Sequence, residues 1–430
     1  MRRGTSIGPV AVLCCGLMAG NARADDLRQL IDDMLRGNDR LAAATSDTES
    51  ARNTMEYTRG GWYPTLTSTI NYGYEKQNKP SGSLDTQAYR NQYTASLKQL
   101  LWDFGAVNAS INASEASHKR TEAQQEVVRQ GLILDGVTAY ANLVKNLQQM
   151  DYARESVTNI RRQTGLEEAK VALGSGLSSD VLQAKRQLAG ADASRVKAEI
   201  DLGKAQNAFR YVFNKAMADA KTMRMPRVPL DLMPASHDDA LKAARANSPA
   251  IKAAGHTVEY YRQQMEGTRA QAFFPKIELV GEANDKRNIS GTMGAQQELL
   301  AKVEVSMPFN LGFTAINSLK AAESSLAAYD RRLSDTRDLL EKDVGNAWED
   351  YILSKERAAS LRNEAVLANE FLELARKERQ LGNRSLIDVL AGETALINAQ
   401  SQAASAEADV VIAAYTVLAV IGSLDPGFIR

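Results

Sequence analysis

An internal repeat divides the 430-residue chain into two similar halves. The turn residues Gly174, Asp180, Val181 and Leu182 recur 208 positions later as Gly382, Asp388, Val389 and Leu390. The pairs Tyr63-Pro64 and Phe104-Gly105 recur at nearly the same offset as Phe274-Pro275 and Leu311-Gly312. A fixed long period indicates a duplicated structural unit. We therefore expect a first helix-hairpin-helix repeat over 25–232 and a second over 233–430, which together build one fold.

Each repeat contains two segments in which apolar and polar residues alternate. The alternation is clean over 65–74 and 298–307 and weaker over 93–102 and 276–284. Period-two alternation predicts β-strands with one apolar face, and about ten residues is the length at which a tilted strand crosses a bilayer. Four strands cannot close a barrel, so any barrel requires several chains. The remaining hairpin residues, 76–90 and 285–296, are expected to be loops at the cell exterior.

Two proline-free segments, 106–173 and 313–381, predict the longest helices. At 1.5 Å per residue each would be about 100 Å long, and a seven-residue repeat of apolar residues from Leu319 to Ala347 indicates coiled-coil packing. The shorter segments 180–214 and 238–273 together match one long helix in length. We expect them to stack end to end beside it, with the proline-containing stretch 225–234 and both termini at mid-height.

The N-terminus has the pattern of a secretory signal peptide over 1–24. A charged start and a short apolar run precede Ala22-Arg23-Ala24, an A-x-A cleavage site; the alternative is a buried N-terminal helix. Both cysteines, Cys14 and Cys15, lie in this leader, so we expect no disulfide. Neither follows a small residue, as the cysteine of a bacterial lipoprotein signal does, so we expect no acylated N-terminus. The full chain has 52 basic and 52 acidic residues. This balance disfavours nucleic acid as a partner.

No pattern of catalytic residues is recognisable. The three histidines are widely separated and lack the spacing of a zinc helix, and no Gly-rich phosphate loop or nucleophile elbow occurs. Paired carboxylates such as Asp32-Asp33 and Glu167-Glu168 are expected to be solvated on polar helix faces. The sequence therefore predicts neither an enzyme nor a cofactor or metal site.

The leader, the duplicated unit and the Gly-x5-Asp-Val-Leu turn together resemble the TolC family of outer-membrane efflux and secretion ducts. The resemblance implies an α+β membrane protein: a homotrimer with a 12-stranded β-barrel, four strands per chain, continued by a periplasmic α-helical coiled-coil barrel. It implies a passive channel in the outer membrane of a Gram-negative bacterium. Its partners would be outer-membrane lipid, a periplasmic adaptor (membrane fusion) protein, an inner-membrane ABC or proton-driven pump, and protein or small-molecule cargo.

The resemblance also assigns residues to a gate at the periplasmic mouth. Arg384 matches an arginine that links neighbouring helix pairs, Asp180 matches its acidic partner, and Asp388 matches a ring of carboxylates that narrows the channel. Two family positions differ, because Ala391 replaces a second ring aspartate and Arg379 an aromatic hydroxyl. The alternative role for these turn residues is helix capping, with Ser385 as the cap.

One other class of function remains open on the sequence. A structural or adaptor-like periplasmic coiled coil would use the hairpins as soluble β-domains rather than as membrane strands. The apolar and tyrosine residues on one face of the ten-residue strands favour the barrel.

Overall fold

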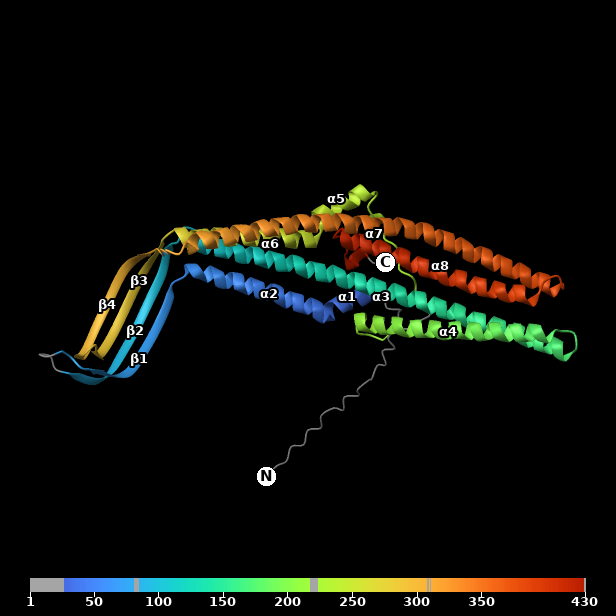
Figure 1. The fold of residues 1–430 in the computed structure, drawn as a ribbon, viewed down its shortest axis with the longest axis horizontal. Helices are drawn as coiled ribbons and strands as arrows, with labels where there is room; N and C mark the ends of the chain where they lie inside the picture. The colour runs from blue at the N-terminus through green and yellow to red at the C-terminus, as the bar shows by residue number, and fades with distance from the viewer. Residues whose placement is uncertain (1–26, 81–84, 217–222, 308, 310, 429–430) are drawn as a thin grey trace, which may run out of the picture.

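The computed structural model describes residues 27–80, 85–216, 223–307, 309 and 311–428. The molecule is a long rod with a β-sheet at one end and, at the other end, two tight turns that each connect a pair of antiparallel helices (Figure 1). Each repeat contributes half-length helices, a β-hairpin, a long helix and a further half-length helix, in that order. The predicted signal peptide, 1–24, lies outside the described residues.

The two β-hairpins form one antiparallel sheet. Its strands are paired in the order β1 (Thr65–Gln77), β2 (Thr86–Trp102), β3 (Lys276–Ile289) and β4 (Thr292–Ser306). They are 13 to 17 residues long, so the prediction of ten-residue strands was wrong. Most of the expected loop 285–296 is strand, joined by a turn in which Gly291 has a φ of 74°. Alternation missed these residues because polar side chains occupy both faces of the sheet there.

The strand register gives the sheet two faces of opposite character. Directly paired residues share a face, so Leu66, its partner Leu97 and the next partners Gly281 and Ala301 lie on one side. This apolar face has exposed large side chains: Leu66, Ile70, Tyr72, Leu97, Leu279, Leu299, Val303 and Val305. The opposite, polar face includes Thr67, Lys98, Glu282, Lys286 and Lys302. The predicted two-sided strands are confirmed.

The long helices α3 (Ala106–Ala172) and α7 (Thr314–Gln380) each have 67 residues. Each follows a residue with positive φ, Gly105 at 96° and Phe313 at 56°, which turns the chain out of the sheet. At the start of α3 the Asp103 carboxylate accepts hydrogen bonds from the free N–H groups of Gly105 and Val107, at 3.1 and 2.6 Å. Both long helices are as the sequence predicted.

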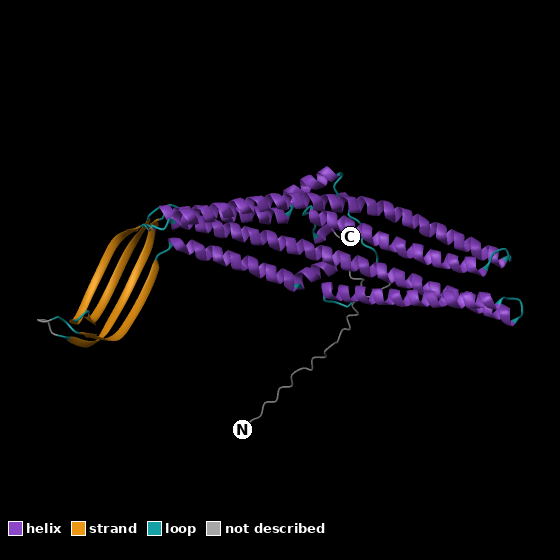
Figure 2. Ribbon diagram, in the orientation of Figure 1, coloured by secondary structure: helices purple, strands orange, loops and turns teal. Residues whose placement is uncertain are grey.

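Shorter helices line the long ones. They are α1 (Leu27–Gly37), α2 (Asp39–Arg59), α4 (Ser178–Phe213), α5 (His237–Asn247), α6 (Pro249–Phe273) and α8 (Leu386–Val420). Both α4 and α6 pack against α3, as expected, but they do not stack on each other. The helix in line with α4 is α2, joined through α1, and the helix in line with α6 is α8 (Figures 1 and 2). The chain after α4 crosses to the other helix layer before α5 begins, so each repeat completes its own stack.

The largest core lies at mid-height, where these stacks meet. Ile31 of α1, Ile133 of α3, Phe209 of α4 and Tyr415 of α8 are buried together. The Tyr415 hydroxyl donates a hydrogen bond to the backbone oxygen of Arg227 at 3.2 Å, which ties the proline-containing joint to α8. The described C-terminal turn, η4 (Pro426–Phe428), packs on α1. The joint, the first described helix and the described C-terminal turn therefore lie at mid-height, as expected.

One described helix, α8, is long and apolar enough by composition to cross a membrane. Half of its most apolar window is buried inside the chain, against α3, α4 and α7. Two adjacent apolar rows on α8 supply this contact. Seven of their ten members are buried: Val389, Leu390, Ala403, Ala404, Val411, Val417 and Leu418. This broad apolar stripe therefore serves neighbours on both sides of α8.

Candidate gate at the helical end

The two turns at the helical end of the rod have the same backbone. Gly174 and Gly382 lie in the left-handed region, with φ of 73° and 81°, a conformation that glycine adopts without strain. After each glycine an N–H bonds back five residues, from Ser175 to the Lys170 oxygen and from Asn383 to the Glu378 oxygen, both at 2.9 Å. These are helix-ending motifs.

Asp180 and Asp388 occupy the first turns of α4 and α8. Asp388 is exposed, and its N–H donates to the Ser385 hydroxyl at 3.2 Å, so the predicted cap is present. Asp180 is half-buried, and its N–H donates to the Leu177 oxygen at 3.1 Å. Within the described residues neither carboxylate has an ion-pair partner, so both remain available to groups outside the single chain.

At this end α3 and α4 form one helical hairpin, and α7 and α8 form the other. Arg384 contacts residues of its own hairpin. Its Nε atom lies 3.0 Å from a Glu378 carboxylate oxygen, and its guanidinium covers the Phe371 ring at 5.2 Å. The single chain therefore does not contain the expected bond between Arg384 and Asp180. A bond between neighbouring chains remains a prediction.

The strongest polar link between the two hairpins is an ion pair that the sequence did not reveal. Arg379, near the end of α7, bonds to the carboxylate of Glu167 on α3, which also accepts from Lys170 at 3.0 Å. Glu167 is only 3% exposed, so the expectation of a solvated carboxylate was wrong for this residue. The α7 end covers it, and a sequence pattern on α3 alone cannot show that.

The charge of Glu167 is stabilised by its two partners. Burial by itself would raise the pKa of the Glu167 carboxyl, but hydrogen bonds and charge from Arg379 and Lys170 outweigh burial and lower this pKa. The carboxylate is therefore ionised near neutral pH. Removing either partner would leave a buried charge short of compensation.

A second contact between the hairpins lies further into the helices. Gln187 of α4 donates a hydrogen bond to the Thr394 hydroxyl of α8. Beside it, Ile160 of α3 and Ala184 of α4 pack against Leu386 and Leu390 of α8 in a small buried cluster. One ion pair, one hydrogen bond and four apolar side chains thus hold the hairpins together at this end.

Within each hairpin, a further ion pair joins the two helices at equivalent positions of the repeat. Glu168 and Lys185 lie 2.8 Å apart between α3 and α4. Exactly one repeat length later, Arg376 and Glu393 pair between α7 and α8 with the charges reversed. Each hairpin is thereby fixed internally. A movement at this end is therefore expected to separate one hairpin from the other rather than to split either of them.

The chain matches the family described as outer membrane efflux protein over residues 30–214 and 240–423. It is 24% identical over 426 residues to the outer membrane efflux protein BepC of Brucella suis biovar 1, covering 96% of this chain and 89% of BepC. It is 21% identical over 418 residues to the outer membrane protein TolC of Vibrio cholerae, covering 95% and 93% of the two chains.

The fold is also similar to solved structures. The outer-membrane channel OprN superposes with a TM-score of 0.81 at 20% identity, and the match covers 93% of this chain and 90% of OprN. This likeness extends over the sheet and the helices together.

Proposed function

Because this chain belongs to the outer membrane efflux protein family, we propose that it is the outer-membrane exit duct of a three-part export system. It conducts protein or small-molecule cargo from the periplasm to the exterior, and an inner-membrane ABC or proton-driven pump supplies the energy. The family consists of efflux channels rather than enzymes, and in this role the chain needs no catalytic residues or cofactor.

The observation that carries this proposal is the four-stranded sheet with an exposed apolar face. Among the described residues, each of its outer strands, β1 and β4, has one edge without a partner strand. An open edge cannot remain unpaired in hydrocarbon, because no water satisfies its N–H and C=O groups. Three copies joined edge to edge close a 12-stranded barrel with the apolar face toward lipid. The same three-fold arrangement continues the helices as a periplasmic tube.

We propose that the helical end is the gate of this duct. Glu167 and Arg379 hold the two hairpins of one chain together, while Asp180 and Arg384 form the link between neighbouring chains. Asp388, exposed in the first turn of α8, forms the ring of three carboxylates. Opening separates the hairpins, whose internal ion pairs stay intact.

The adaptor protein docks at the same end in this proposal. The turns present large apolar side chains to solvent, with Leu173 at 83% and Leu381 at 76% exposure. Exposed apolar residues of this size are characteristic of interaction surfaces. The boundaries 25–232 and 233–430 for the two repeats belong to this proposal, with both repeats contributing to one barrel and one tube.

The decisive experiment combines assembly with conduction. The mature protein, purified from outer membranes in mild detergent, should have the mass of a trimer and form ion-conducting channels in a planar lipid bilayer. A monomer recovered in the soluble periplasmic fraction, without channel activity, would disprove the proposed duct.

A further inference from the structure

The apolar face of the sheet carries charged side chains only near the end that contains the β3–β4 turn, away from the helices. Four successive rows, from the one containing Ile277 to the one containing Ala283, have no charged side chain on this face. The next two rows of β3 bring Asp285 and then Arg287 onto the same face. On β1 the same two rows hold Ile70 and Tyr72, and the first charge on this face, Lys76, comes two rows further toward the end of the strand. The apolar rows correspond to the hydrocarbon layer, so these charges lie at the level of the outer-leaflet headgroups.

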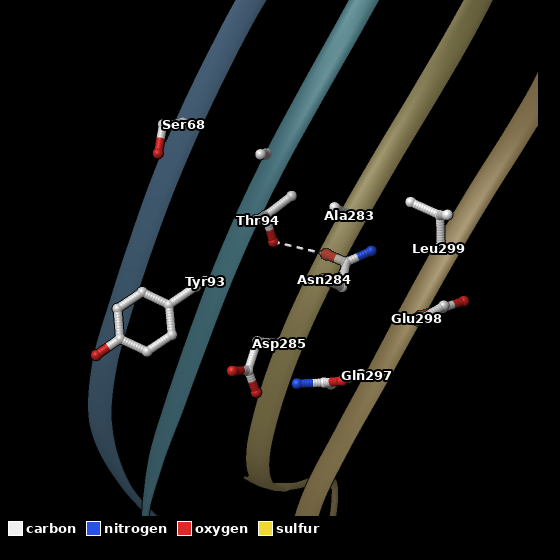
Figure 3. Close-up of a pocket in the computed structure, with 10 residues that line it drawn as sticks. Ser68, Tyr93, Thr94, Ala283, Asn284, Asp285, Gln297, Glu298 and Leu299 are labelled. Carbon is white, nitrogen blue, oxygen red and sulfur yellow. Dashed lines mark hydrogen bonds between the residues drawn. The ribbon is translucent and has the colours of Figure 1, made fainter.

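A hollow of about 460 Å³ lies at this boundary. Its floor is the row of small residues Ser68, Ala95 and Ala283, which are direct partners across three strands. Tyr93 and Leu299 of the same face stand beside it, as Figure 3 shows. The three small side chains, beside the larger Tyr93 and Leu299, leave a depression on the apolar face.

Polar groups line the headgroup side of this hollow. Asp285 and Gln297 are direct partners between β3 and β4, and their side chains point toward one another (Figure 3). Arg287 is the next residue of β3 on the same face and is exposed. Among the described residues Arg287 has no ion-pair partner, whereas Arg90 on the polar face pairs with Glu75 at 3.3 Å.

We propose that this hollow binds a phosphorylated glycolipid of the outer leaflet. An acyl chain lies on the small-residue floor beside Tyr93 and Leu299. Asp285 accepts a hydrogen bond from a sugar hydroxyl, and the Arg287 guanidinium pairs with a phosphate, for which its planar donors are suited. The site occurs three times around the barrel. This inference rests on the proposed barrel, because only a closed barrel directs the apolar face toward lipid.

The probes are lipid A and lipid A from which the phosphates have been removed, which share the same acyl chains. Native mass spectrometry of the detergent-purified protein reports the oligomer and its bound lipid in one spectrum. The trimer should retain lipid A more strongly than the phosphate-free form. Arg287→Gln should reduce lipid A retention about tenfold, the effect of one hydrogen bond to a charged group. It should change retention of the phosphate-free lipid little.

The matched control is Arg90→Gln, which removes the same charge from the polar face and should leave lipid retention unchanged. Ala283→Leu fills the hollow and should lower retention of both lipids; Ala95→Leu repeats this test on another strand. Equal retention by the Arg287→Gln and Arg90→Gln trimers would overturn the inference, and so would equal binding of the two lipids by the parent trimer. Absence of a trimer in the parent protein would instead refute the proposed duct.

Discussion

Arg379 of α7 reaches Glu167 of α3, and this ion pair joins the two hairpins of one chain at the helical end. Glu167 is buried and ionised. This ion pair is weakened when either residue is substituted and when acid protonates Glu167.

The first prediction concerns this link. Arg379→Ala leaves the buried Glu167 carboxylate without its main partner, at a cost of about 3 to 5 kcal/mol, so the hairpins should separate more readily. Single-channel conductance in a planar bilayer should rise. Glu168→Gln is the control, because this neighbouring residue pairs within its own hairpin. The gate assignment would be wrong if both variants conducted like the parent trimer.

The second prediction is a pH dependence. Since the pKa of Glu167 is lowered from its ordinary value of 4.5, the link contributes fully above that pH and weakens as the pH falls through the lowered value. Conductance of the parent channel should therefore rise on acidification below about pH 4.5. The Glu167→Gln channel should lack this rise. An equal acid response in both proteins would show that another group controls it.

The third prediction separates the link between chains from the carboxylate ring. Arg384→Ala and Asp180→Ala should raise conductance, because each removes one partner of the proposed bond between neighbouring chains. Asp388→Ala should mainly reduce cation selectivity, since three carboxylates around an axis concentrate cations. Reversal potentials in a salt gradient measure this. If all three trimeric variants matched the parent in both properties, these residues would act only in the helix turns.

The fourth prediction tests which face of the sheet contacts lipid. Leu66→Arg places a charge on the apolar face at a cost of about 2 to 4 kcal/mol near the bilayer midplane. Thr67→Arg places it one residue later on the polar face, which lines the aqueous channel. The first variant should reduce the yield of trimer on mild-detergent gels, and the second should assemble normally. Equal yields would contradict the assignment of the two faces.

The fifth prediction fixes the orientation of the barrel. The β1–β2 connection, 78–85, and the β3–β4 turn at Gly291 should face the cell exterior, where insertions are tolerated. An epitope inserted at either place should be labelled by antibody on intact cells, while one inserted after Gly174 should be labelled only after permeabilisation. The reverse pattern, with trimer intact, would invert the topology.

Local patterns were enough to predict the elements of this fold. Proline-free stretches and heptads gave both long helices to within a residue or two, and alternation, clean in β1 and β4 and weaker in β2 and β3, gave the part of each strand that lies next to the helices. The strand ends near the exterior were missed because both faces are polar there. The stacking of α4 was missed because length alone cannot distinguish α2 from α6 as the helix in line with it.

The residues of the candidate gate also fall into two groups, those that the sequence predicted and those that only the tertiary structure revealed. The turn glycines and the Ser385 cap depend on neighbours within a few residues, so the sequence by itself determined them. Glu167 differs from Glu168 only in the side of α3 that it occupies. The sequence of α3 does not indicate that α7 covers that side. The tertiary structure alone decided that one carboxylate is buried against Arg379 and the other pairs within its hairpin. The physical reason is that burial and charge compensation depend on groups more than 200 residues away in the chain.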